Sequence, residues 1–190
     1  MGLDWKWLIG LAIGVGGIAA PILYDRYEKK QERQAALQNI IQEAAAVQQR
    51  IVRLKSLARG TGFPSQVEPA HVMRKDALAL ADMSLDALKP FEPMQDTREL
   101  IDAYEDNINF LFNDMSYCAF LDETALLPLT YAIEEVHLLR NTLRFELFYD
   151  QGKLSESERQ DALDKMLEKS VRGDETAFYT SINGCRAASD

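Results

Sequence analysis

The stretch 37–58, LQNIIQEAAAVQQRIVRLKSLA, decides the fold prediction for this chain of 190 residues. Its apolar residues recur at alternating spacings of three and four positions. They are Leu37, Ile40, Ala44, Val47, Ile51, Leu54 and Ala58. These spacings place side chains on one face of a helix, so the stretch predicts a helix with a continuous apolar seam.

Two kinds of partner would bury this seam. A sustained repeat of threes and fours is typical of a coiled coil between two chains. Ala44 and Ala58 offer little contact area, however, which weakens a dimer that stands alone. We therefore expect the seam to pack on other helices of its own chain, with self-association as the alternative. The residues that define this stalk seam are Leu37, Ile40, Val47, Ile51 and Leu54.

A run without a charged residue, WLIGLAIGVGGIAAPILY, lies before the seam, from Trp7 to Tyr24. As a helix it would be roughly 27 Å long, close to the ~30 Å hydrocarbon core of a bilayer. The aromatic rings at its two ends favour the headgroup layer. The run, which contains Pro21, therefore predicts a membrane-spanning helix. The spacing of Gly10 and Gly14 lets helices approach closely in lipid, so spans could associate there.

Three other interpretations of this run fit its surroundings less well. A cleaved signal peptide needs a basic start, but Asp4 offsets Lys6, and Pro21 lies where cleavage would occur. The residues 14–19 fit the dinucleotide-binding pattern G-x-G-x-x-A, which requires strands that the sequence does not predict. A core helix in water would be destabilised by the four glycines of the run.

Basic residues on either side of the run predict its orientation. Lys6 precedes it, whereas Arg26, Lys29, Lys30 and Arg33 follow it closely. Lys and Arg accumulate on the cytoplasmic side of membrane spans, so we expect the large C-terminal part to be cytoplasmic. The chain has only two cysteines, which agrees with a reducing compartment.

The rest of the chain has the apolar spacing of helices throughout, and Gly and Pro occur mainly at the breaks between the predicted helices. Predicted helices cover about 25–59, 69–88, 96–118, 129–149 and 155–172. Asp96 with Glu99, and Ser155 with Glu158, resemble capping boxes. The predicted fold is all-α: one N-terminal membrane helix, a long helical stalk and an antiparallel bundle of about five helices. The expected divisions are a membrane anchor at 1–24, a basic stalk at 25–60 and an acidic cytoplasmic bundle at 61–190.

The predicted stalk and the predicted bundle carry net charges of opposite sign. Residues 25–60 contain eight Lys or Arg against four Asp or Glu, a local net charge of +4. Residues 61–190 contain 12 against 25, a local net charge of −13. The chain has no basic patch with interleaved aromatic residues outside the stalk, so nucleic-acid binding is not expected. The acidity of the bundle either keeps the protein soluble or binds a basic partner.

Metal chemistry has one candidate pattern in the sequence. The only two histidines both lie in E-x-x-H, as in dimetal helical bundles, where each such motif faces a lone Glu. The paired positions would lie at different levels along their helices, which disfavours such a site. Glu134 and His137 remain weak metal candidates, and we expect His137 on a half-buried face beside Glu134 and Arg140. No other catalytic motif occurs, and no cofactor is predicted.

Aromatic residues are concentrated in the third and fourth predicted helices and are not confined to one stripe. They would cover a second helix layer or form a surface for a partner. The residues are Phe110, Phe112, Tyr117, Phe120, Tyr131, Phe145, Phe148 and Tyr149.

Three functions fit these patterns. The first is a membrane-anchored, non-enzymatic adaptor that binds a protein partner or self-associates through the stalk and the Gly-rich span. The second is a membrane-bound enzyme with a metal site in the bundle. The third is a membrane-active effector whose spans assemble into a pore. The absence of catalytic motifs favours the first function.

Overall fold

The computed structural model describes the backbone of four segments of the chain, which carry five α-helices and one short 3₁₀ helix. These segments are 5–61, 67–91, 95–118 and 126–169. Side chains are described for 20–59, 70–90, 95–113 and 126–168. The helices are α1 (Trp5–Thr61), α2 (Val67–Leu88), η1 (Lys89–Phe91), α3 (Gln95–Cys118), α4 (Leu126–Asp150) and α5 (Glu156–Lys169). The described segments contain no strand, so the all-helical prediction is confirmed.

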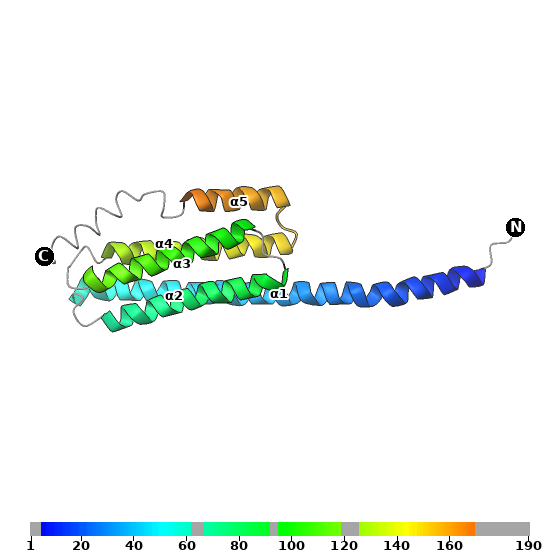
Figure 1. Ribbon diagram of the computed structural model, residues 1–190, viewed down its shortest axis with the longest axis horizontal. Coiled ribbons are helices and arrows are strands. Elements are labelled where there is room, and N and C mark those ends of the chain that lie inside the picture. The colour runs from blue at the N-terminus through cyan, green and yellow to red at the C-terminus, as the bar shows by residue number, and fades with distance from the viewer. Residues whose placement is uncertain (1–4, 62–66, 92–94, 119–125, 170–190) are drawn as a thin grey trace.

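The helices form a bundle around one half of α1, and the other half of α1 projects beyond it (Figure 1). α1 packs mainly on α4 and α2, while α3 packs on α2 and α4. The short α5 lies outside this group, against α4 and α3. Because α1 has 57 residues, it is about 86 Å long and far exceeds its neighbours.

The stalk seam is buried by the helices of its own chain. Leu37, Val47 and Ile51 are fully buried, and Ile40 and Leu54 are each 3% exposed. All five belong to one apolar core with residues of α2, α3 and α4. The predicted stalk and the predicted bundle therefore share a single core rather than meeting at residue 60.

Helix ends follow the sequence signals in most places. Ser155 and Glu158 form the predicted capping box: the Ser155 amide donates to Glu158 Oε2 at 2.8 Å, and the Glu158 amide donates to Ser155 Oγ at 3.3 Å. At the end of α4, Gly152 adopts a φ of 72°, a left-handed conformation that glycine tolerates without strain. The Lys153 amide then donates to the Phe148 carbonyl at 2.8 Å and closes the turn.

Two predicted helix starts differ from the structure. α4 begins at Leu126 rather than residue 129, because the buried Pro128 fits into the first turn of a helix, where its missing N–H is no loss. The predicted capping box of Asp96 and Glu99 is wrong. Both residues lie inside α3: Asp96 accepts a hydrogen bond from Gln160, and Glu99 accepts one from Gln95.

The predicted membrane span lies mostly in residues 7–19, whose side chains are outside the described part of the chain. Among the described residues, no helix combines the length and the apolar character that a bilayer crossing requires. The membrane part of the predicted fold is therefore not supported by this finding. Residues 20–32 of α1, which follow directly, are all exposed.

The seam makes a direct prediction for stability. In a chain lacking residues 1–24, Ile51→Asp should lower the free energy of unfolding by about 3 kcal/mol or more, because it buries an unpaired charge. The matched control is Val52→Asp, since the neighbouring Val52 is 47% exposed, and it should cost no more than about 0.5 kcal/mol. Urea denaturation followed by circular dichroism measures both changes.

Equal effects of the two substitutions would contradict the burial of the seam. A melting temperature that rises with protein concentration would indicate that the seam pairs between chains.

Candidate functional site

Charged side chains are buried together where α1 leaves the bundle. We call this group the Glu146 cluster; it consists of Arg33 from α1, Thr97 from α3, Glu146 and Asp150 from α4, and Arg159 from α5. Glu146 is only 2% exposed and Arg159 only 1%. Charged residues are rarely buried this deeply unless they are paired, so the cluster is the strongest candidate for a site.

Glu146 is held by donors from three other helices. Its Oε1 accepts hydrogen bonds from Arg159 Nη1 at 2.6 Å and from Thr97 Oγ1 at 3.0 Å. Its Oε2 accepts a hydrogen bond from Arg33 Nη2 at 3.0 Å. One carboxylate therefore ties α4 to α1, α3 and α5, and its charge is compensated by two guanidinium groups.

Asp150 lies one turn further along α4 and forms a second ion pair with Arg33. The Arg33 Nε and Asp150 Oδ2 atoms are 2.8 Å apart, although they are not aligned as a hydrogen bond. Gln34 donates to the main-chain carbonyl of Asp150 at 3.1 Å. Burial raises the pKa of Asp150 above its ordinary value, and the opposing effect of Arg33 is smaller.

Arg159 anchors α5 to the cluster. Its Nη2 donates to Glu156 Oε1 at 2.7 Å, and its guanidinium lies 5.2 Å from the centre of the Tyr149 ring. Burial lowers the pKa of Arg159, but its hydrogen bonds to Glu156 and Glu146 raise it above the ordinary value. Hydrogen bonds from Arg159 and Tyr149 lower the pKa of Glu156. The charged groups of the cluster are thus paired with one another.

Sequence reasoning missed most of this cluster and assigned Arg33 a different role. Arg33 was expected among the basic residues that flank a membrane, but only 15% of its side chain is exposed and it pairs with Glu146 and Asp150. A signal for Glu146 was present in the sequence. It lies between Leu143 and Leu147, at a position where the apolar spacing of α4 calls for a buried side chain.

The other predicted membrane residues are only partly described. Arg26, Lys29 and Lys30 are exposed, and Lys29 pairs with Asp25 at 2.9 Å. Pro21 and Tyr24 are also exposed. The side chains of Trp7, Gly10 and Gly14 are outside the described part of the chain.

The metal candidates lie apart from the cluster. Glu134 and His137 are both exposed, so the expected half-buried position of His137 is wrong. His137 Nε2 lies 2.9 Å from Asn141 Nδ2. Within the described residues, no three His, Cys, Asp or Glu side chains are grouped as a metal site. Glu43, the lone Glu that precedes the first E-x-x-H motif in the sequence, pairs with Arg50 at 2.9 Å.

The aromatic residues divide between the core and the surface. Phe112 is buried, and Phe110 and Tyr131 pack against the core from its edge. Phe148 is 38% exposed, and its ring lies 5.4 Å from Lys153 Nζ. Most of the described aromatic residues thus cover packed helices. Tyr117 and Phe120 are outside the described side chains.

Comparison with protein-family models, with curated protein sequences and with solved structures finds no match to this chain. Its function has to be argued from its own geometry. The Glu146 cluster joins four helices through groups that are already paired, an arrangement that holds elements in place rather than one that exposes a reactive group.

The cluster predicts a large effect of Glu146→Gln. In the chain lacking residues 1–24, this change leaves Arg33 and Arg159 without their shared buried anion and should cost about 3–5 kcal/mol of unfolding free energy. The matched control is Glu156→Gln, because the Glu156 side chain is 54% exposed and its loss should change stability little. Equal stability of the two variants in urea denaturation would show that Glu146 does not hold the helices together.

Asp150 should behave differently from Glu146. A raised pKa means that the folded state binds the proton of Asp150 more tightly than the unfolded state does. The contribution of this residue to stability should therefore increase as the pH falls toward the ordinary value of 3.8. We expect Asp150→Asn to cost less than Glu146→Gln at neutral pH. The wild-type chain should then gain stability relative to Asp150→Asn as the pH is lowered; a relative loss would contradict the sign of this shift.

Proposed function

We propose that the protein is a membrane-anchored, non-enzymatic helical interaction protein, in which α1 holds the bundle near a bilayer. The observation that carries this proposal is the projecting half of α1. Residues 20–32 are all exposed, and they continue directly from the charge-free run that begins at Trp7. A helix that leaves its own core with an apolar surface needs another apolar environment.

The exposed apolar side chains at the start of the described region support the anchor. Ile22 is 50% exposed, Leu23 64%, Tyr24 67% and Tyr27 61%. Four large neighbouring side chains in water are unusual for a soluble surface, because contiguous exposed apolar patches mark interaction sites. Two tyrosines at this level also fit a headgroup layer.

Pro21 supports the same proposal. It lies inside α1, where a proline removes a backbone hydrogen bond and costs about 3 kcal/mol in a helix in water. Proline is better tolerated within membrane helices than in exposed soluble ones.

We propose that the bundle lies on the cytoplasmic side. Although Arg33 is engaged in the Glu146 cluster, Arg26, Lys29 and Lys30 remain exposed after Tyr24, against Lys6 before the run. Lys and Arg near a span accumulate on the cytoplasmic side. An anionic inner leaflet would attract these three residues and repel the acidic bundle, which would then stand away from the surface.

In this proposal the Glu146 cluster joins the bundle rigidly to its anchor. It lies at the root of the projecting helix and fixes that root to α3, α4 and α5 through Arg33, Thr97 and Arg159. A bundle joined rigidly to its anchor keeps a defined orientation to the membrane. Because the stalk seam is buried within the chain, self-association is proposed only through the small residues Gly10 and Gly14 of the span.

Flotation with lipid vesicles tests the anchor. The full chain, reconstituted with phospholipid, should float with the vesicles after carbonate washing, whereas a chain lacking residues 1–24 should stay at the bottom of the gradient. Ile13→Arg with Ile18→Arg should impair insertion, because each arginine costs about 2.5–3.5 kcal/mol at the centre of a span. The control is Gln42→Arg, an exposed position of α1 within the bundle, which should float normally.

Retention of the truncated chain on vesicles, or failure of the full chain to float, would overturn the proposed anchor. A circular dichroism spectrum of each variant checks that loss of flotation does not reflect loss of the fold.

A further inference from the structure

α5 lies on the outside of the bundle, against α4 and α3 (Figure 1). Among the described residues, the apolar core is built by α1, α2, α3 and α4, and α5 contributes no side chain to it. Eight of the 14 residues of α5 are charged, and Leu163 is the one apolar residue among its described side chains that is fully buried. Gln160 adds a polar contact, since it donates a hydrogen bond to Asp96 of α3. A helix that buries so little apolar surface is held weakly by the hydrophobic effect.

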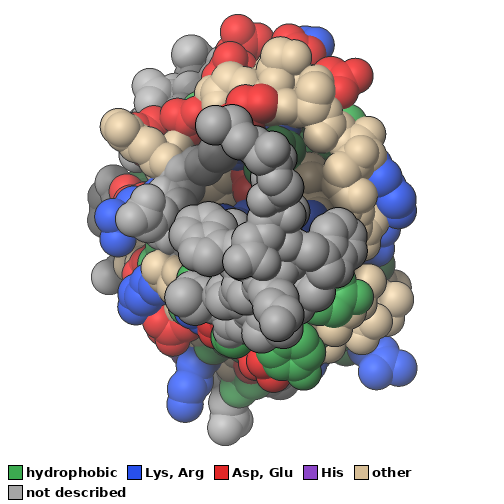
Figure 2. Space-filling model, turned by 90° about the vertical axis from the view of Figure 1, so that its right-hand side faces the viewer, with side chains coloured by type: hydrophobic (Ala, Val, Ile, Leu, Met, Phe, Trp, Pro, Cys, Tyr) green, Lys and Arg blue, Asp and Glu red, His purple; other side chains and the backbone are tan. Residues whose placement is uncertain are grey.

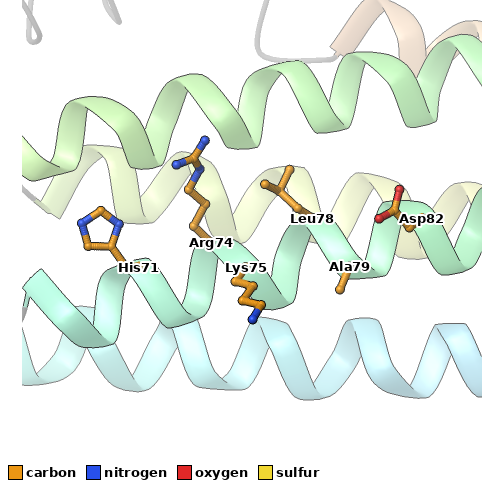
Figure 3. Close-up of a pocket in the computed structure, with 6 residues that line it drawn as sticks. All are labelled: His71, Arg74, Lys75, Leu78, Ala79 and Asp82. Atoms are coloured by element: carbon orange, nitrogen blue, oxygen red, sulfur yellow. The ribbon is translucent and has the colours of Figure 1, made fainter.

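α2 is attached to the bundle in a different way. Figure 3 shows Arg74 of α2, which lines a surface hollow, pointing toward α3. Its Nη2 donates a hydrogen bond to Asn109 Oδ1 of α3 at 2.7 Å. α2 also buries Ala77, Leu80 and Leu88 in the apolar core. The polar contact of α2 therefore adds to an apolar attachment, whereas the attachment of α5 is chiefly polar.

The ion pair that holds α5 on α4 joins two charges that each have a second partner. Arg159 Nη1 donates to Glu146 Oε1 at 2.6 Å. On its other oxygen, Glu146 accepts a hydrogen bond from Arg33 of α1 at 3.0 Å. Arg159 also donates to Glu156 of its own helix at 2.7 Å. Separation of α5 from α4 therefore leaves neither charge unpaired, which avoids the main cost of breaking a buried ion pair.

The connection between α4 and α5 lies between two helix ends that are each complete in themselves. On the α4 side, the Lys153 amide donates to the Phe148 carbonyl at 2.8 Å. On the α5 side, the Ser155 amide donates to Glu158 Oε2 at 2.8 Å. No backbone hydrogen bond of the described residues crosses Leu154. A rotation at Leu154 would therefore move α5 without breaking either helix end.

We infer that α5 is a strap that opens from the bundle as a unit and controls access to the buried carboxylate of Glu146. Opening separates Arg159 from Glu146 and exposes Leu163. It uncovers the Glu146 side chain, which is only 2% exposed while α5 is docked. The apolar core and the hydrogen bond from Arg33 to Glu146 stay in place, because neither includes a residue of α5. Opening of α5 does not require the proposed membrane anchor.

Arg159 should therefore act on the docking of α5 and not on the folding of the core. When the strap is open, the Arg159 side chain lies in water, so the loss of its charge leaves the open state nearly unchanged. The loss of overall stability in an Arg159 variant is then limited to the free energy that docks α5. Glu146 differs, because it also binds Arg33 and Thr97 on two helices of the core.

Amide hydrogen exchange of the full chain in mild detergent, measured by mass spectrometry, tests the strap. A detached helix of this length is marginal in water, so the amides of α5 exchange when it opens. Residues 157–168 should exchange about 100-fold or more faster than residues 37–58 of the seam, yet more slowly than an unstructured peptide. Arg159→Gln should speed the exchange of residues 157–168 by a further factor of about ten or more, because a charge-assisted hydrogen bond is lost. The exchange of residues 37–58 should not change.

The matched control is Lys165→Gln, which removes the same charge from α5 but breaks only an exposed pair with Asp161. It should leave the exchange of residues 157–168 within about twofold of the wild-type rate. In the wild-type chain, exchange of α5 at the rate of the seam, or at the rate of an unstructured peptide, would overturn the strap. So would an Arg159→Gln variant that leaves α5 unchanged, one that speeds exchange of α5 and the seam alike, or an equal effect of the control.

Discussion

Burial of the α1 seam is the constraint on which the rest of this molecule depends. The same helix supplies Val47 and Ile51 to the core and then continues beyond the bundle as a free rod (Figure 1). A helix transmits its direction along its length, because every turn is hydrogen bonded to the next. The packing of the seam against α2 and α4 therefore also sets the direction of the projecting segment.

The Glu146 cluster holds α1 against α4 at the point where the apolar packing of α1 ends. The seam stops at Leu37, and the position four residues before it, where the seam would continue, is occupied by Arg33. Buried ion pairs contribute little net stability, but they are costly to break and they fix geometry through directed hydrogen bonds. α5 depends on the cluster most, since its fully buried apolar side chain is Leu163 and its outer surface is strongly charged. Acidic side chains gather at the top of the molecule, over α5, in the view along α1 (Figure 2).

Different tasks are thus distributed along α1. Residues 20–32 are exposed, Arg33 ties the helix to α4, and the inner face of residues 37–58 lies in the core. A single helix thus both contributes to the core and projects beyond it (Figure 1).

The all-helical fold, the stalk seam and most helix ends could be predicted from the sequence, because apolar spacing, glycine stops and the Ser155 cap act over a few residues. Which charged side chains meet, in contrast, depends on how distant helices pack. Arg33 and Glu146 are separated by 113 positions, and nothing local to Arg33 distinguishes a buried ion pair from a residue that flanks a membrane. Periodicity identifies the face of a helix that is buried, but the partner of each side chain is set by how separate helices align, and that alignment is a property of the packed core.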